Sequence, residues 1–250
     1  MSRLLRLRDE QWRRIEPFLP PQHETGGRPA KPHRPVVEAM IWVLRTGAPW
    51  RDLPPAYGPW KSVHTRFSRW SKSGVLQRLL GGLAKECDDE GYLIDATIVR
   101  AHQDASGGAK KGGAQPIGRS RGGPSTKLHA VVDALGNPVR FVLTPGQAHE
   151  MRVASELLGE IHDAYVVGDS AYRSKRLVEE LRGRGCQVVI PSQPTHLYRT
   201  FDGHMYRERR LVENFFQRIK RFRRIAMRFD KLACNYMAFV VLASVLVWLL

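Results

Sequence analysis

Residues 92–102 read YLIDATIVRAH, and this stretch predicts the central strand of a β-sheet. Successive side chains alternate between two faces, as they do in a strand. One face carries Leu93, Asp95, Thr97 and Val99, and the other carries Ile94, Ala96 and Ile98. A buried carboxylate is unfavourable unless it is paired or bound to a metal. Asp95 is therefore either a functional residue or an ordinary residue on an exposed polar face.

The segments after this strand predict an α/β domain with a mixed sheet, which we place at residues 90–250. Two β-branched runs around ALGNP predict a hairpin, and later strands are separated by helices. The expected elements are the hairpin at 126–146, helices at 149–162 and 174–185, and strands at 164–172 and 186–192.

A Gly-rich basic loop, residues 103–125, separates the first strand from the hairpin. Loops of this length inside a compact domain are usually functional or disordered. Its basic residues could contact DNA or could simply be solvated. They are Lys110, Lys111, Arg119 and Arg121.

The preceding segment, residues 1–85, is predicted to be a small all-α domain. Residues 60–74 predict a helix with a buried stripe of Val63, Phe67 and Trp70. Its open faces carry Lys61, His64, Arg66 and Arg69. A helix, a short turn and a basic helix with an aromatic stripe are typical of a helix-turn-helix DNA-binding domain. The alternative is an ordinary helical bundle with a solvated basic face.

Composition favours a polyanionic partner, because the 250 residues carry a formal net charge of +16. The three cysteines have neither zinc-site spacing nor the pattern of a disulfide framework. The longest apolar run, AFVVLASVLVWLL at residues 238–250, is shorter than the roughly 20 residues of a membrane span. We therefore expect a buried final helix, no membrane partner, and a cytoplasmic, nucleoid-associated protein.

Two further acids stand out by context. Asp169 follows the predicted strand AYVVG, and open α/β sheets place their sites at the carboxyl ends of strands. It could instead cap a helix. Glu213 lies in YRERRLVENFFQRIKRF, residues 206–222, which reads as one long basic helix. It could pair with Arg209 or Arg210, or it could join other carboxylates around Mg²⁺ near DNA phosphates.

The sequence resembles the DDE transposases of bacterial insertion sequences. YRERRLVENFFQRIK matches their Y-(2)-R-(3)-E-(6)-K signature through Tyr206, Arg209, Glu213 and Lys220. LIDATIVRAH and VVGDSAYRS resemble the two aspartate motifs of that family. Residues 47–70 and 117–150 are similar to the IS5 family in particular, so the resemblance covers nearly the whole chain.

The resemblance implies an RNase H-like catalytic core in which Asp95, Asp169 and Glu213 hold two Mg²⁺ ions, with Mn²⁺ as a possible substitute. It implies cleavage of double-stranded DNA at terminal inverted repeats and joining of the 3′-OH ends to target DNA by two-metal phosphodiester transfer. Arg209 and Lys220 would hold phosphates, Tyr206 would orient DNA, and the protein would act as at least a dimer. The alternative is a catalytically inactive, transposase-derived DNA-binding regulator.

Overall fold

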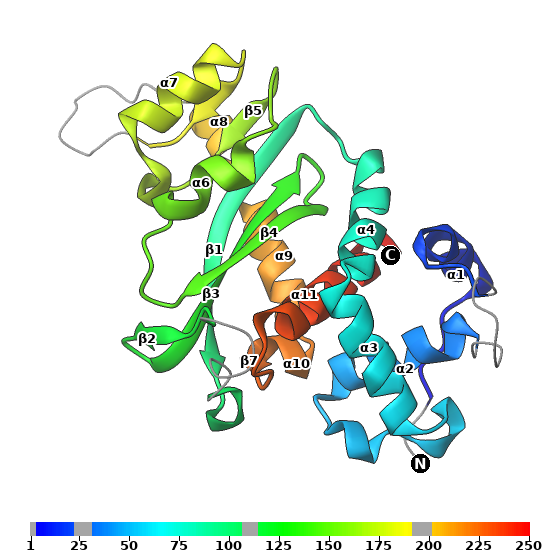
Figure 1. Ribbon diagram of the computed structural model, residues 1–250. Helices are drawn as coiled ribbons and strands as arrows, with labels where there is room; N and C mark the ends of the chain where they lie inside the picture. The colour runs from blue at the N-terminus through cyan, green and yellow to red at the C-terminus, as the bar shows by residue number, and fades with distance from the viewer. Residues whose placement is uncertain (1–3, 23–31, 107–114, 192–201) are drawn as a thin grey trace.

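The computed structural model describes residues 4–22, 32–106, 115–191 and 202–250. The strand predicted around Asp95 is β1 (Gly91–Ala101), and it lies in the middle of a mixed sheet (Figure 1). The other strands are β2 (Gly118–Ser120), β3 (Gly123–Asp133), β4 (Pro138–Pro145), β5 (Tyr165–Val167), β6 (Gln187–Val189) and β7 (Met227–Arg228).

The strand order confirms the predicted fold class. β3 is antiparallel to β1 from Tyr92↔Asp133 to Arg100↔Ser125, and β4 continues the sheet antiparallel to β3. On the other side of β1, β5 and then β6 run parallel to it. The resulting order β4-β3-β1-β5-β6 joins three antiparallel strands to two parallel ones and forms an RNase H-like mixed sheet.

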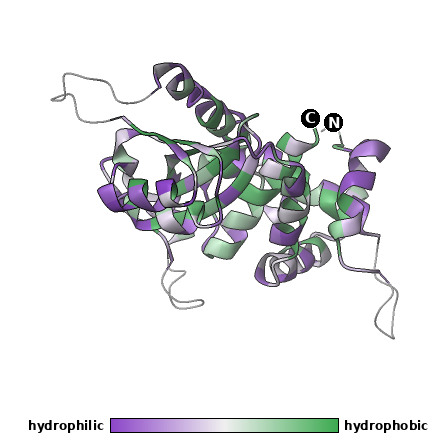
Figure 2. Cartoon of the chain, turned by 90° about the horizontal axis from the view of Figure 1, so that it is seen from above, coloured by the Kyte–Doolittle hydropathy of each residue, from purple (hydrophilic) through white to green (hydrophobic). Residues whose placement is uncertain are grey.

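Helices cover both faces of the sheet (Figure 1). On one face, α6 (Met151–Leu158) and α7 (Lys175–Gly183) pack on Ile94 and Val166. On the other face lie α9 (Arg210–Lys220), α10 (Arg223–Ala226) and α11 (Ala233–Trp248). Seen from above, apolar segments concentrate toward the middle of the molecule (Figure 2).

The N-terminal region is helical, as predicted. Its helices are α1 (Asp9–Ile15), α2 (His33–Thr46), α3 (Trp60–Lys72) and α4 (Val75–Leu83). The predicted stripe on α3 is buried, and Phe67 packs against Phe239 of α11 with ring centroids 4.5 Å apart. These helices therefore share one hydrophobic core with α11 and with one face of the sheet.

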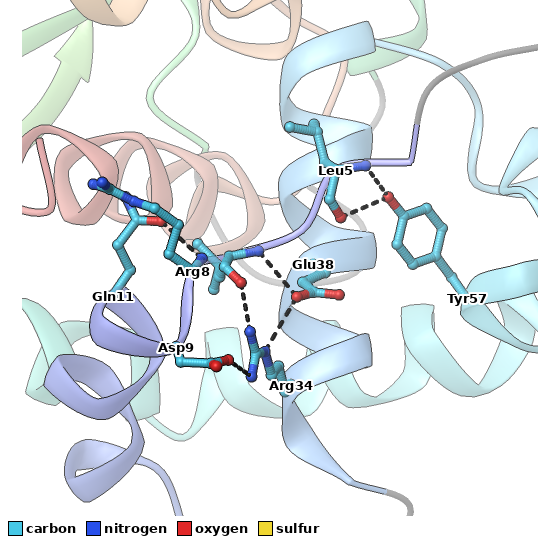
Figure 3. Close-up of polar contacts among 8 residues, drawn as sticks. Leu5, Arg8, Asp9, Gln11, Arg34, Glu38 and Tyr57 are labelled. Carbon is cyan, nitrogen blue, oxygen red and sulfur yellow. Dashed lines mark hydrogen bonds and ion pairs between the residues drawn. The ribbon is translucent and has the colours of Figure 1, made fainter.

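Polar contacts fasten the extended N-terminal segment to α2 (Figure 3). Arg34 donates to the Leu7 carbonyl at 2.5 Å and pairs with Asp9 at 2.6 Å. The Leu7 amide in turn donates to Glu38 at 3.0 Å. A charged pair on α2 thus satisfies both backbone groups of Leu7.

The apolar C-terminal run forms the buried helix that we expected. α11 carries Tyr236, Phe239 and Val240, all of which are completely buried. Among the helices that the structure describes, none has both the length and the apolar character needed to cross a membrane.

The prediction of one long basic helix over residues 206–222 is wrong. α8 (Gly203–Arg207) ends before a turn at residues 208–209, and α9 begins at Arg210. The reason is a local change in hydrogen bonding, because the amides of Glu208, Arg209 and Leu211 each donate to the carbonyl three residues earlier. Tyr206 and Glu213 therefore lie on different helices.

Candidate active site

Two of the predicted acids lie on neighbouring parallel strands. Asp95 lies on β1, and Asp169 follows β5 after Gly168. Leu93 is in register with Val167 in this parallel pair of strands. Asp95 and Asp169 each lie two residues further along the chain, so they reach the same part of the sheet. Asp169 also accepts a hydrogen bond from the Ala171 amide at 2.8 Å. Asp169 is therefore a turn cap, as the alternative interpretation had it, and its carboxylate also lies close to that of Asp95.

A third acid, Glu150, joins them. Asp95, Glu150 and Asp169 each offer a carboxylate oxygen, and these oxygens lie within 4.8 Å of one another. Glu150 directly precedes α6, and its place depends on how α6 lies over the sheet. Its sequence context gives no signal of this, because an acid at the start of a helix is common for local electrostatic reasons.

Electrostatics distinguishes Asp95 from an ordinary surface acid. Burial is the largest influence, and it raises the pKa of Asp95 from 3.8 to about 6. The Ala96 amide and the Arg209 guanidinium oppose this, whereas the charges of Asp169 and Glu150 raise the pKa further. With only 14% of its side chain exposed, Asp95 is poorly solvated and faces two like charges.

Glu213 lies outside this group of three and is connected to it through Arg209. One guanidinium nitrogen of Arg209 donates to Asp95 at 3.2 Å, and the other pairs with Glu213. The pairing of Glu213 with Arg209, one of the alternatives that the sequence left open, is therefore present. Arg209 occupies the space between the two carboxylates.

The other signature residues lie along the same helix pair. Lys220 donates to the Thr97 hydroxyl at 2.5 Å and to the Ile98 carbonyl at 3.4 Å, and burial lowers its pKa. The Tyr206 ring lies 6.0 Å from the Arg209 guanidinium carbon. α9 thus crosses β1 with one cation beside Asp95 and a second beside Thr97.

Glu150 is held by a lysine on the central hairpin. The Lys127 ammonium group donates to Glu150 Oε1 at 3.2 Å and to the Ala148 carbonyl at 2.8 Å. Glu150 Oε2 is buried and has no hydrogen-bond partner among the described residues. The buried Tyr172 hydroxyl lies close to Glu150 but outside hydrogen-bonding geometry. Burial raises the pKa of Tyr172, and the charges of the three carboxylates, Glu150 first, raise it further.

The remaining DNA-contact candidates are spread over two surfaces. Four lie on α3: Lys61 and Arg69 are exposed, and His64 and Arg66 are half-buried. His64 packs edge-on against Trp50 at 5.3 Å, and an Arg66 guanidinium nitrogen lies 3.1 Å from His33 Nδ1. Burial lowers the pKa of both His64 and Arg66.

Arg119 and Arg121 are exposed beside the β2–β3 turn. They line a hollow of about 520 Å³ together with Arg100 and Ile98 of β1. A separate hollow of about 880 Å³ lies between the N-terminal segment and α11, and none of the three clustered carboxylates lines it. Lys110 and Lys111 lie outside the described residues.

The donor set fits a hard divalent cation. All three clustered ligand groups are carboxylates, which Mg²⁺ and Mn²⁺ prefer over nitrogen or sulfur donors. One arginine and one lysine contact the group, so its negative charge is not fully compensated from within the protein. A bound cation would supply the missing charge.

The fold and this site define the chain as an RNase H-like protein with a carboxylate centre beside a basic helix. More particularly, the chain belongs to the DDE transposases of the IS4/IS5 type. The family described as "Transposase DDE domain" matches residues 86–248, and "Putative transposase of IS4/5 family" matches residues 7–80.

Individual relatives agree with this assignment. A Sinorhizobium fredii protein, "Uncharacterized protein y4sN", is 44% identical over 111 residues, which are 44% of this chain and 89% of the relative. "Putative transposase for insertion sequence element IS6501" of Brucella ovis is 38% identical over 130 residues, 50% of this chain and 98% of the relative.

Among solved structures, the piggyBac transposase synaptic complex with hairpin DNA matches with a TM-score of 0.39 and 10% identity. This match covers 76% of the chain and 49% of the piggyBac chain, so the protein spans about half the length of that transposase.

Proposed function

We propose that this protein cleaves DNA at the terminal inverted repeats of its insertion sequence and joins the freed 3′-OH ends to target DNA. The observation that carries the proposal is the meeting of Asp95 on β1 with Asp169 just after the neighbouring strand β5, in a chain of the DDE transposase family. Water would be the first nucleophile and the 3′-OH the second, with no covalent enzyme intermediate.

Asp95 and Asp169, together with Glu213, would hold two Mg²⁺ ions, for which Mn²⁺ can substitute. Such ions, when bound, activate the attacking oxygen and stabilise the leaving oxygen of a phosphodiester. Arg209 would link metal binding by these carboxylates to the binding of DNA. A phosphate can accept both of its guanidinium N–H groups and thus compete with Asp95 and Glu213. Glu213 is then free to contribute its carboxylate.

Lys220 and Tyr206 would hold and orient the DNA next to the cut. We assign DNA binding mainly to residues 1–85, through Lys61, His64, Arg66 and Arg69, and the chemistry to residues 90–250. Arg119 and Arg121 would extend the DNA-binding surface from the sheet, and Lys110 and Lys111 belong to the same basic loop. We infer that at least two copies act together on the element ends, in the cytoplasm at the nucleoid.

The high positive charge predicts a strong salt dependence of DNA binding. Each phosphate contact releases counterions, so affinity should fall about 10³-fold or more between 50 and 200 mM salt if six or more phosphates are contacted. A gel-shift titration with end-containing DNA measures this slope. A flat response would exclude the basic residues as the DNA surface.

The test of the chemistry uses labelled DNA carrying the element ends, Mg²⁺ or Mn²⁺, and the wild type beside Glu213→Gln. The matched control is Glu208→Gln, which removes an acid from the same basic segment, where Glu208 pairs with Arg210 at 3.5 Å. We expect the wild type and the control to nick the DNA at the element end. Glu213→Gln should bind DNA and not cut it.

Two other outcomes would change the proposal. Normal DNA binding by the wild type with no cleavage under any divalent metal would favour the inactive regulator. Equal cleavage by the wild type and Glu213→Gln would remove Glu213 from the site.

A further inference from the structure

We propose that Glu150 is an additional metal-binding carboxylate of this centre, and that with Asp95 and Asp169 it binds a divalent cation in the free protein, before DNA is present. The proposal rests on the proposed function for what the cation does afterwards. Cation binding itself can be measured without DNA or catalysis.

The geometry of Glu150 supports this role. One oxygen of Glu150 lies within 4.8 Å of oxygens from both Asp95 and Asp169. Lys127 holds the Glu150 side chain in place, because it donates to Glu150 Oε1 and to the Ala148 carbonyl. Oε2 is left buried with no hydrogen-bond partner among the described residues, although a buried carboxylate oxygen normally has one. A cation at the centre would be that partner.

The buried hydroxyl of Tyr172 also lies near the three clustered carboxylates. Tyr172 is 0% exposed, and its hydroxyl has no hydrogen-bond partner in the described part of the chain. It approaches Glu150, Asp95 and Asp169, which are the three carboxylates of the group. A buried hydroxyl without a partner is unfavourable. A water held by a cation between the carboxylates would accept its hydrogen bond.

Glu213 is not available to the same cation in this arrangement. Arg209 pairs with Glu213 and with Asp95 at once, so a positive charge separates Glu213 from the three clustered carboxylates. For Glu150, Lys127 contacts only Oε1, and the buried Oε2 has no hydrogen-bond partner among the described residues. The free protein therefore offers Asp95, Asp169 and Glu150 as its cation ligands.

Isothermal titration calorimetry of the full-length protein with Mn²⁺, in the absence of DNA, tests the proposal. We expect one site in the wild type. Glu150→Gln should weaken Mn²⁺ binding at least about 10-fold, since even outer-shell partners of a metal contribute that much to affinity. Glu156→Gln is the matched control, because Glu156 is an exposed acid on the same helix. Glu213→Gln should also bind Mn²⁺ like the wild type.

Two results would overturn the proposal. One is wild-type affinity in Glu150→Gln when Asp169→Asn has lost binding. The other is no Mn²⁺ binding by the wild type without DNA. In either case, DNA cleavage that depends on Asp95, Asp169 and Glu213 would leave the proposed function intact. No cleavage by the wild type under any divalent metal, with Mn²⁺ binding that depends on Glu150, would overturn the proposed function and leave this proposal intact.

A measurement on the unmodified protein guards against a folding defect in Glu150→Gln. Fe²⁺ with ascorbate and peroxide cleaves a polypeptide next to the bound iron, and mass spectrometry locates the cuts. Without DNA, we expect cuts near residues 95, 150 and 169, which excess Mg²⁺ suppresses. Cuts near residues 95 and 169 with none near Glu150 would overturn the proposal.

Discussion

Two aspartates of this protein have similar surroundings at first sight and different roles. Asp95 is largely buried and Asp230 is fully buried, both contact an arginine, and burial raises the pKa of both. They differ in their other neighbours. Asp230 lies among Arg224, Arg228 and His64, whose charges lower its pKa, whereas Asp95 faces Asp169 and Glu150, whose charges raise it.

The Asp230 cluster is charge-paired within the protein, although Asp230 Oδ2 and Arg224 Nε, 3.3 Å apart, lack hydrogen-bond geometry. Arg228 is completely buried and donates to the Thr126 hydroxyl at 2.7 Å and to the Asp230 carbonyl at 3.0 Å. Its guanidinium also lies 5.6 Å from the Tyr236 ring. These contacts join β7 to β3 and α11. A buried acid surrounded by cations has its charge compensated within the fold, whereas Asp95 has one arginine and two neighbouring acids.

The largest expected effect is on catalysis. Asp169→Asn should lower the rate of DNA nicking about a thousand-fold, because it removes a ligand from a centre worth several kcal/mol to the transition state. Asparagine caps a turn as well as aspartate does, so the bond to the Ala171 amide can be kept. Single-turnover cleavage of labelled end DNA measures the loss.

The exposed Asp163 supplies the control for that experiment. Asp163→Asn changes the same charge at a surface position and should leave the nicking rate unchanged. If Asp169→Asn cuts at the wild-type rate, Asp169 resembles Asp230 more than Asp95, and its role is that of a structural cap.

The next largest effect is on the free energy of unfolding and concerns Asp230. Asp230→Ala leaves Arg224 without its carboxylate partner, and breaking a buried pair in this way costs about 3–5 kcal/mol. Urea denaturation should show this loss. Glu160→Ala breaks the exposed pair with Arg140 and should cost about 1 kcal/mol or less. Equal losses in the two variants would contradict the contrast between buried and exposed pairs.

The site acids should destabilise the protein when no metal is present. Asp95 releases its proton near pH 3.8 when unfolded and near pH 6 when folded, so the folded state holds more protons between these values. Stability therefore falls as the pH rises through this window, and the loss is complete above about pH 6. Its upper limit is about 3 kcal/mol.

Asp95→Asn removes this titration. In EDTA at pH 8, urea denaturation should show the variant to be more stable than the wild type by about 1–3 kcal/mol, and the difference should vanish below about pH 4. A variant that is less stable at pH 8 would mean that the charge of Asp95 is compensated within the protein, as that of Asp230 is.

The sequence predicted the parts of this fold that depend on local pattern. Alternation marked β1, and the apolar stripe of α3 marked its buried face, because side-chain period reports secondary structure directly. The turn at residues 208–209 and the short strands β2 and β7 were missed. β7 pairs with Arg100 of β1, which is far away in the sequence, and β2 is only three residues long. The turn comes from a local change in hydrogen bonding that the helical pattern of side chains does not reveal.

The site residues divide in the same way, into those that local sequence pattern singles out and those that only the fold brings together. Asp95 and Asp169, which lie close together in the structure, could be singled out from the sequence, because each sits in an apolar strand context where an acid is unusual. Glu150 could not, since only the docking of α6 on the sheet brings it to Asp95. The sequence also left Glu213 with two possible arginine partners, and the structure pairs it with Arg209.

The smallest effect compares the two arginines. Arg209→Gln should cost at most about 1 kcal/mol of stability, because its pairs with Asp95 and Glu213 are partly solvated and the site acids already repel one another. Arg224→Gln should cost about 3–5 kcal/mol, since Asp230 is then left deeply buried with less compensation. Urea denaturation of both variants at pH 7 decides the matter. Equal costs would mean that Arg209 holds the site together as Arg224 holds the core. A small cost for Arg209 together with weakened DNA binding would mean that its position next to Asp95 serves the DNA phosphate.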